Sequence, residues 1–582
     1  MNNRESQYAH MVNIIADSSP SNWEDITCIL ADIRTSARMP PPRAKDELLH
    51  MIAAGTAFLT FDYGIDGVSI EIAKYALALE YLYSSQTECA IHFIGGDFYP
   101  QADSVLKPDW RRHKIAGING WSKWDGGKWF SALFYQDMNE GSPQSDQLAV
   151  EIYRQAGVIA NKLGGYLVDN NISMLIPVNI ASNPGNLALT LAIAFITETM
   201  DIKIINSNHD FYWDGGKPAS ERRPGEEPGI RDHFFRNVQN KSFFTLLKSL
   251  YPWNGQNWLQ VNINKLQSEM LITEFGFPAS KVFELSTSLS DEFFEEYTKQ
   301  EVKSARLRMG YILSDGEASV HPVPVESHID NLSNWMANQK PCMLGARAGL
   351  SFDPTSENLI YLLQPTRVVA RKRIQRELHL LGALMDYPPF RNAFEQNTAL
   401  QLVLHITGPT PIEHQVDLEA VLQAYIDVLR SVPVSISDRL FLAFSVGNED
   451  HPSFRSNNFN RLSIEEIYRM ASAVVFPSET EGRGLPILEA CASGVPLICS
   501  RYNPHAVFAD VIGESLPENQ QIRYTLFPES DFPPPFLEEA TAILLHPENY
   551  LERTRHNREA VHVRFSTTAF RERFIKLIDD LS

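Results

Sequence analysis

At 582 residues the chain is too long for one hydrophobic core of ordinary size, so two domains with extensions are expected. Its 44% hydrophobic and 21% charged residues are typical of a folded globular protein and argue against a disordered one. The formal net charge of -20 repels polyanions, and we therefore expect no nucleic-acid partner.

The first fifty residues predict an N-terminal helical extension. The spacing of Ile26, Leu30 and Ile33 is helical, and the pattern breaks at the proline run 40–42. We interpret the few basic residues here as part of a solvated linker rather than an anion-binding surface. The beginning of the chain lacks the apolar core of a signal peptide, and the most apolar helix, 187–196, is too short for a transmembrane segment. With five scattered cysteines and no CxxC pair, these features predict a cytoplasmic protein with reduced thiols.

Two series of short apolar runs alternate with helical patterns. The first series predicts strands at 57–61, 90–96, 173–179 and 202–208, with helices at 70–83 and 185–198. The second predicts strands at 359–365, 400–408, 440–447, 471–478 and 495–500. This alternation is typical of α/β domains with parallel, doubly wound sheets. The predicted organisation is extension 1–50, first domain 51–315, irregular connector 316–357, second domain 358–560 and C-terminal helix 561–582.

The segment 471–500 carries the clearest chemistry. A buried strand leads into a glycine-containing loop, and a helix begins at Leu485, so the loop lies at the carboxyl edge of the sheet, where such folds bind ligands. Gly482 and Gly484 let backbone N–H groups approach an anion at the helix N-terminus, as a diphosphate would require.

Two glutamates frame this loop. Glu481 stands in the loop and Glu489 about one turn into the helix, so that one carboxylate reaches a sugar and the other a ribose. A carboxylate accepts two hydroxyl hydrogen bonds at once, which suits a diol. An ordinary helix charge and a surface glutamate would explain either residue alone. The glycines and the strand beside them favour a nucleotide-sugar site.

The sequence FPSETEGRGLPILEACASGVPLICS resembles the signature of retaining glycosyltransferase family 4, which includes sucrose synthases and bacterial glycosyl transferases of group 1 type. The resemblance implies a GT-B fold, two Rossmann-like domains facing a cleft. It extends to QPTRVVARKRIQRELHLL, where Arg367 and Lys372 match the two cations that hold the donor diphosphate. Arg371 and Arg373 are nearby alternatives.

The resemblance also implies further donor contacts. These are Arg483, Leu485 and Gly408 in the second domain and, in the first, a glycine loop around Gly67. Arg483 stands where the family usually has an aromatic residue, and the family's Asn-Gly turn near the end of the first domain is replaced by ELSTSLSDEFF. The details of the donor pocket therefore depart from the pattern.

A histidine after a strand of the first domain is the third landmark. His209 follows the strand 202–208, and the family often has a histidine there that contacts the donor hexose. Asp210, Tyr212 and Trp213 beside it are suited to an acceptor sugar or to plain packing. The loop that follows is long and polar. Its cations are expected to receive an anionic acceptor, and they are Lys217, Arg222, Arg223 and Arg231.

The resemblance implies front-face substitution, with the cations stabilising the leaving diphosphate and the nucleotide sugar as co-substrate. We expect no cofactor and, because the chain has no Asp-x-Asp pair, no metal. UDP-glucose is the favoured donor, GDP-mannose is compatible, and the acceptor is expected to be soluble because no basic amphipathic helix is present. A pyridoxal-phosphate phosphorylase and a catalytically silent sugar-nucleotide-binding scaffold are the alternatives. The sequence leaves open whether the chain forms a homo-oligomer.

Overall fold

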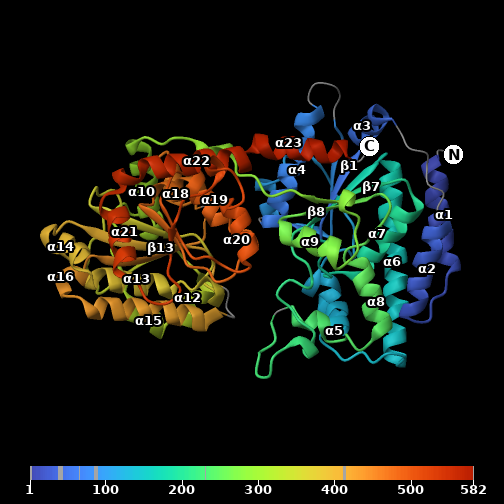
Figure 1. Ribbon diagram of the computed structural model, residues 1–582, viewed down its shortest axis with the longest axis horizontal. Coiled ribbons are helices and arrows are strands. Elements are labelled where there is room, and N and C mark those ends of the chain that lie inside the picture. Colours follow the sequence, from blue (N-terminus) through green and yellow to red (C-terminus); the bar gives the residue numbers. More distant parts are fainter. Residues whose placement is uncertain are drawn as a thin grey trace. The chain divides into compact units, whose positions relative to one another are not determined.

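The computed structural model describes residues 3–36, 44–64, 66–83, 89–229, 231–410, 414–447 and 449–580. The chain divides into two compact units, one made of Met1–Thr287 with Phe570–Ser582 and the other of Ser288–Ala569 (Figure 1). This boundary after Thr287 differs from the predicted one after residue 315, and the predicted break at prolines 40–42 lies outside the described residues. No helix in the described ranges is both long and apolar enough to cross a membrane.

The first unit is built on a seven-stranded, all-parallel sheet in the order β5-β3-β1-β6-β7-β8-β9. Its strands are β1 (Thr56–Leu59), β3 (Ile91–Gly95), β5 (Arg111–Lys114), β6 (Met174–Pro177), β7 (Lys203–Asn208), β8 (Trp258–Asn262) and β9 (Val282–Glu284). A separate two-stranded ladder joins β2 (Asp62–Tyr63) and β4 (Asp97–Phe98). The four strands predicted here are all present, within one to two residues of the predicted ends.

The first unit's helices cover this sheet (Figure 1). They are α1 (Asn3–Asp17), α2 (Trp23–Ser36), α3 (Lys45–Ala54), α4 (Gly67–Tyr83), α5 (Lys128–Phe134), α6 (Pro143–Asp169), α7 (Leu187–Thr199), α8 (Lys241–Leu250), α9 (Lys265–Thr273) and α23 (Thr567–Asp579). Helix α7 is apolar on all sides and almost wholly buried, as expected of a core helix.

The described N-terminal residues are helical, as predicted, but their helices are packed on the first unit rather than standing apart as an extension. Helices α1 and α2 pack on α6, α7 and α8, and Met11, Trp23 and Ile26 are fully or almost fully buried in the same core cluster as α7. The Trp23 indole donates to Ser145 Oγ at 3.0 Å. Burial of this apolar face makes the described part of the extension an outer layer of the first unit.

The second unit holds an eight-stranded sheet in the order β10-β11-β14-β13-β12-β15-β16-β17. Its strands are β10 (Val323–Pro324), β11 (Cys342–Gly345), β12 (Leu359–Gln364), β13 (Gln401–Thr407), β14 (Leu440–Ser445), β15 (Ala473–Phe476), β16 (Leu497–Cys499) and β17 (Thr525–Leu526). All neighbours are parallel except β11 and β14. The predicted irregular connector 316–357 contributes β10 and β11 to this sheet, so it is part of the second unit's core.

The helices of the second unit lie around its sheet. They are α10 (Lys299–Leu313), α11 (Val325–Asp330), α12 (Leu332–Asn338), α13 (Gln375–Asp386), α14 (Pro388–Gln396), α15 (Gln415–Ser431), α16 (Val434–Ser437), α17 (Pro452–Ser456), α18 (Ile464–Met470), α19 (Leu485–Ala492), α20 (His505–Ile512), α21 (Pro534–Leu545) and α22 (Leu551–Phe565). Both units are therefore doubly wound α/β folds, as predicted.

The last helix belongs to the first unit, although the chain reaches it from the second. Phe570 and Phe574 of α23 are buried and meet Tyr75 of α4 edge to face, with ring centroids 5.4 and 5.1 Å apart. The amphipathic pattern predicted such a helix without indicating where it packs.

Candidate active site

Three neighbouring strands of the second unit end at the same edge of its sheet. Strand β12 lies between β13 and β15 and is parallel to both. The loops that follow them carry Arg367 and Lys372, Gly408, and the segment from Glu481 to Gly484. Because parallel strands present their carboxyl ends together, residues more than a hundred positions apart meet here.

Lys372 and Glu481 form a buried ion pair at this edge. The Nζ of Lys372 contacts Glu481 Oε1, and the two side chains are only 8% and 9% exposed. Burial lowers the pKa of Lys372, and the attraction of Glu481 partly opposes that shift. Arg371 Nη1 lies 3.5 Å from Glu481 Oε2, so the single carboxylate faces two cations. The cluster therefore has surplus positive charge beside the glycine loop.

The remaining cations of this segment differ in their partners. Arg367 is exposed, and its side chain makes no hydrogen bond or ion pair with a described residue. Arg373 forms ion pairs with Glu479 at 2.9 Å and Glu529 at 2.8 Å. Arg371 donates to the Thr480 carbonyl at 2.7 Å. Since Arg371 and Arg373 are paired with other parts of the protein, Arg367 is the cation of this segment whose side chain remains available to a ligand. Lys372 is paired with Glu481, and its contact with a ligand stays a prediction.

The glycine loop is held in place by backbone hydrogen bonds. Glu481 N donates to Asn503 O at 2.9 Å, and Asn503 N donates to Glu479 O at 2.7 Å. Gly484 precedes α19 with φ +65°, which favours glycine, and a side chain there would collide with the hydroxyl of Tyr502. Gly482 has open space around the position of a side chain. The loop just before α19 is thus open at Gly482.

The other predicted donor contacts near this loop differ in their exposure. Arg483 is half-buried, and Leu485 is 37% exposed at the first position of α19. Glu489 is half-buried, and its Oε2 accepts a hydrogen bond from the Tyr468 hydroxyl at 2.5 Å. Tyr468 of α18 and Tyr502 were missed by sequence reasoning, because a lone tyrosine outside a motif gives no signal of proximity.

Gly408 is buried against the loop after β12. A side chain at this position would collide with the backbone of Thr366 and Arg367. Below it, Gln364 Nε2 donates to Glu377 Oε1 at 2.5 Å, and burial raises the pKa of Glu377 well above its ordinary value. Gly408 and the carboxyl group of Glu377 therefore fix the path of the segment that carries Arg367.

The glycine loop of the first unit differs from the expected phosphate-binding loop. The Asp66 carboxylate accepts hydrogen bonds from Val68 N and Ser69 N, both at 2.9 Å, and so caps the first turn of α4. Gly67 is the first residue of α4, and the Asp66 carboxylate already accepts from the N–H groups that an anion would use. The structure favours a capping role for this loop over the predicted donor contact of Gly67.

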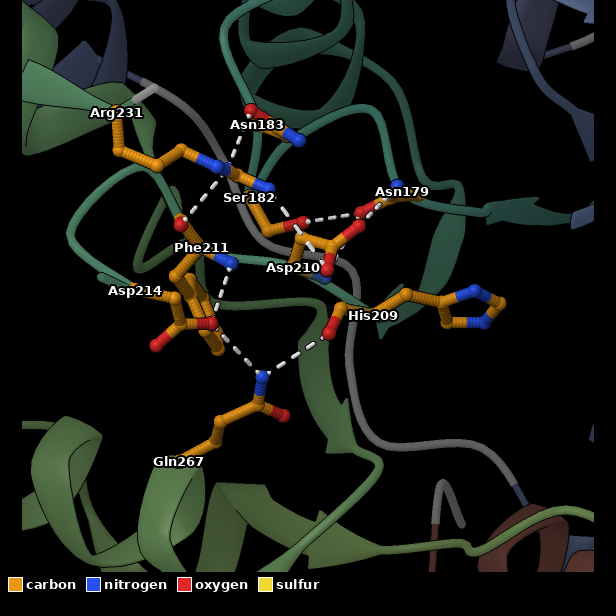
Figure 2. A network of polar contacts seen from close by, with 9 residues as sticks. All are labelled: Asn179, Ser182, Asn183, His209, Asp210, Phe211, Asp214, Arg231 and Gln267. Carbon is orange, nitrogen blue, oxygen red and sulfur yellow. Dashed lines mark hydrogen bonds and ion pairs between the residues drawn. The ribbon is translucent and has the colours of Figure 1, made fainter. Parts of the chain in front are cut away.

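His209 and Asp210 follow β7, as predicted (Figure 2). Asp210 N donates to Asn179 Oδ1 at 3.0 Å, and Gln267 Nε2 donates to His209 O at 3.0 Å. The imidazole of His209 points away from the side chains of Asp214 and Gln267 (Figure 2). The side-chain amides of Asn179 and Gln267 therefore fix the backbone at the end of β7, while the imidazole of His209 takes no part in these hydrogen bonds.

The aromatic pair beside them packs inside the first unit. Tyr212 is 2% exposed and contacts Phe235. Trp213 is stacked between Phe211 and Phe275, with centroid distances of 4.1 and 4.3 Å. Both predicted acceptor residues thus have the packing role, since their ring faces are already covered by other rings.

Most cations predicted to bind the acceptor are paired within the first unit. Arg222 lies 3.4 Å from the buried Asp232, and Lys217 lies 3.3 Å from Glu226. Arg231 donates to Asn183 Oδ1 at 3.0 Å and lies 3.7 Å from Asp210 (Figure 2). Arg223 is exposed and has no ion pair within the described ranges. Binding of an anionic acceptor therefore stays a prediction for Arg223.

Within the described residues, no group of three or more His, Cys, Asp or Glu side chains is arranged to hold a metal ion.

Residues 445–514 match the family described as glycosyl transferases group 1. These residues include the whole glycine loop, Glu481 and Glu489. No curated protein sequence matches the chain.

Several solved structures are similar in fold. A glycosyltransferase from Rickettsia africae ESF-5 matches with a TM-score of 0.50 and 10% identity, over 90% of this chain and 98% of that one. A sucrose-phosphate synthase from Thermosynechococcus elongatus matches with a TM-score of 0.48 and 13% identity, over 90% and 98%. A UDP-forming trehalose-phosphate synthase from Burkholderia xenovorans matches with a TM-score of 0.48 and 11% identity, over 91% and 98%.

The chain has the GT-B fold, and the segment that matches group 1 contains the glycine loop and Glu481, one partner of the buried ion pair. Together these findings support a glycosyltransferase, and so an enzyme of the transferase class.

Proposed function

We propose that the protein is a retaining glycosyltransferase that moves a hexose from a nucleoside diphosphate sugar to a soluble acceptor hydroxyl, with UDP-glucose as the favoured donor. The observation that carries this proposal is the contact between Lys372 and Glu481, which brings a buried cation and a buried carboxylate to the N-terminus of α19. A diphosphate and a sugar hydroxyl are the two groups that this pair suits.

Each part of the site has a distinct role in the proposal. Lys372 and the exposed Arg367 hold the diphosphate with the N–H groups at Gly484, and they stabilise the charge that grows on the leaving phosphate. Glu481 accepts from the hexose hydroxyls, and Glu489 accepts from the ribose. The resemblance to glycosyltransferase family 4 supports front-face substitution, in which the acceptor attacks on the side from which the diphosphate leaves.

The acceptor is proposed to bind the first unit at the end of β7. There His209 extends from the amide network, and Asp210 is 54% exposed in its side chain. Since Tyr212 and Trp213 are covered by other rings, hydroxyl groups rather than a sugar face would be recognised here by hydrogen bonds.

The covering of Tyr212 and Trp213 also favours a second candidate, a GT-B protein that binds a sugar nucleotide without turnover. Release of nucleoside diphosphate distinguishes the two functions. A thermal-shift screen of UDP, GDP, ADP and their sugars, followed by an assay for released nucleoside diphosphate, tests both. A transferase binds one nucleotide and releases it from its sugar, whereas a scaffold binds without release. Stabilisation by none of these nucleotides would contradict both functions.

A further inference from the structure

A pocket of the second unit lies at the amino-terminal edge of its sheet, opposite the edge that carries the candidate active site. Its lining includes Ser472, just before β15 begins, and Pro496, just before β16 begins. Its volume is about 320 Å³. The two strands therefore have the glycine loop at their carboxyl ends and this pocket at their amino ends.

Three guanidinium groups converge on the pocket, and none of the residues that line it is acidic. Arg306 Nη2 donates to Met470 O and Arg469 Nη2 to Glu292 O, both at 2.7 Å. Arg558 Nε donates to Ala492 O at 3.1 Å. Arg306 and Arg469 are thus each anchored to a backbone carbonyl through one nitrogen, which leaves their other N–H groups for another acceptor. Arg558 donates through all three of its nitrogens, and one N–H on each Nη remains for a further acceptor.

Several donors around the pocket are buried without an acceptor. Arg469 is 8% exposed, and its Nε and Nη1 have no hydrogen-bond partner among the described residues. The same holds for Arg306 Nε and for Ser493 Oγ, whose residue is 5% exposed. Buried donors are nearly always paired in folded proteins, because an unmade hydrogen bond is costly. An oxyanion in the pocket would accept from all three residues.

The charge of the pocket also favours an anion. Burial lowers the pKa of Arg469 and of Arg306, and the charge of Arg558 lowers that of Arg469 further. Guanidinium groups nevertheless stay protonated at neutral pH. Glu296 pairs with Arg558 at 3.0 Å, but its side chain is 87% exposed. Glu295 and Glu465 also attract Arg469, and neither lines the pocket.

The pocket is connected to the candidate active site through α19. Arg558 Nη2 donates to Ser493 O at 3.3 Å at the end of this helix, and a side chain at Gly494 would collide with its guanidinium group. The helix has eight residues, a length of about 12 Å, and its other end carries the glycine loop. A second connection runs through α18, where Tyr468 precedes Arg469 and donates to Glu489.

We propose that this pocket binds a phosphate or phosphate-monoester dianion through Arg306, Arg469 and Arg558, and that its occupation changes the affinity of the active site for a nucleoside diphosphate. Paired N–H groups of arginine suit the oxygens of phosphate. The proposed binding of phosphate depends only on the residues of the pocket, whereas the proposed effect on nucleotide affinity rests on the proposed function.

Binding is tested with the full chain by calorimetry and thermal unfolding in inorganic phosphate. Phosphate is expected to raise the Tm of the unaltered protein by a few degrees and to lose this effect in Arg469→Gln. Arg439→Gln is the matched control, because Arg439 is a partly buried arginine that donates to the carbonyls of Phe394, Asn397, Leu400 and Ser435. It should lower the Tm and keep the phosphate effect.

Two further variants keep the test decisive. Arg306→Gln replaces Arg469→Gln if the latter does not fold. Lys372→Ala separates the pocket from the active site, and it should retain the stabilisation by phosphate. Loss of the effect in Lys372→Ala with retention in the arginine variants, or no effect in the unaltered protein, would overturn the site. Glucose 6-phosphate in parallel titrations shows whether a phosphate monoester binds more tightly than the free ion.

The connection is tested by titrating UDP with and without saturating phosphate. We expect a change in the Kd of UDP of about five-fold or more, and an equal change in the Kd of phosphate when UDP is bound. The change should vanish in Arg469→Gln. A change that persists in this variant would indicate direct competition at the active site and overturn the connection. Failure of UDP to bind, with phosphate stabilisation intact, would instead contradict the proposed donor.

Discussion

The ammonium group of Lys372 pairs with the carboxylate of Glu481, 109 residues further along the chain. Each charge is buried, so each depends on the other for the stability of the folded state. The same two groups are proposed to bind different parts of one donor molecule. Stability and activity can therefore be separated by substitution.

Lys372→Ala is expected to leave Glu481 as a buried, poorly compensated carboxylate. The free energy of unfolding should fall by about 3 kcal/mol, less if Arg371 moves closer, and turnover should fall by roughly 100-fold or more. Lys372→Met combined with Glu481→Gln removes both charges and should restore most of the stability without restoring turnover. Chemical denaturation and nucleoside diphosphate release measure the two effects. Recovery of turnover in the double variant would show that the charges are not needed.

The activity of the protein is expected to fall at alkaline pH. Burial lowers the pKa of Lys372 below its ordinary value of 10.5, so the ammonium loses its proton before exposed lysines do. The folded state then binds fewer protons than the unfolded state between the two pKa values, and the contribution of Lys372 to stability rises with pH in that window. A profile of kcat/KM against pH should show an alkaline decline that Lys372→Arg shifts beyond the measured range. An unchanged decline would assign it to another group.

Gly484→Ala is expected to destabilise the glycine loop. Alanine at this position must adopt φ +65°, and its methyl group collides with the Tyr502 hydroxyl. Together these two effects should lower the free energy of unfolding by about 1–3 kcal/mol. Tyr502→Phe removes this hydroxyl, which is buried without a partner among the described residues, and should recover part of the loss in the double variant. Thermal unfolding of both single variants and the double variant forms the test. Strict additivity would show that the two residues do not interact.

Glu377 is expected to act as a neutral hydrogen-bonding group. Its pKa is raised well above the ordinary 4.5 by burial, so the folded state holds a proton that the unfolded state releases. The resulting stability is present below pH 4.5 and is lost as the pH rises through the folded-state pKa. Glu377→Gln should keep the bond to Gln364 and change the unfolding free energy at neutral pH by less than about 1 kcal/mol. It should also remove this pH dependence, and strong destabilisation at neutral pH would show that a carboxylate is required.

The strongest sequence signals came from the second unit. Helix α19 begins at Leu485, as predicted, and a glycine lies just before it and another just after it. Arg367, Lys372 and Glu481 were placed near one another by the resemblance and by the rule that parallel strands share a carboxyl edge. The ion pair itself was not predicted, since a spacing of 109 residues does not fix a contact.

Other features gave no pattern to recognise. Strand β5 consists of Arg111–Lys114, without an apolar residue, and β8 buries Gln260 and Asn262 among apolar neighbours. Gln260 Oε1 accepts from Asn206 Nδ2 at 2.8 Å, so a side-chain amide satisfies what looks like a polar interruption. The burial of α1 and α2 also depends on the surface of α6, which the local pattern cannot show.

The most direct test is the release of nucleoside diphosphate from UDP-glucose and GDP-mannose by the unaltered protein and by Glu489→Ala, each checked for folding. We predict release from one of the two donors by the unaltered protein and a loss of roughly 100-fold in Glu489→Ala. Equal release by the two proteins, or binding of either donor without release, would contradict it.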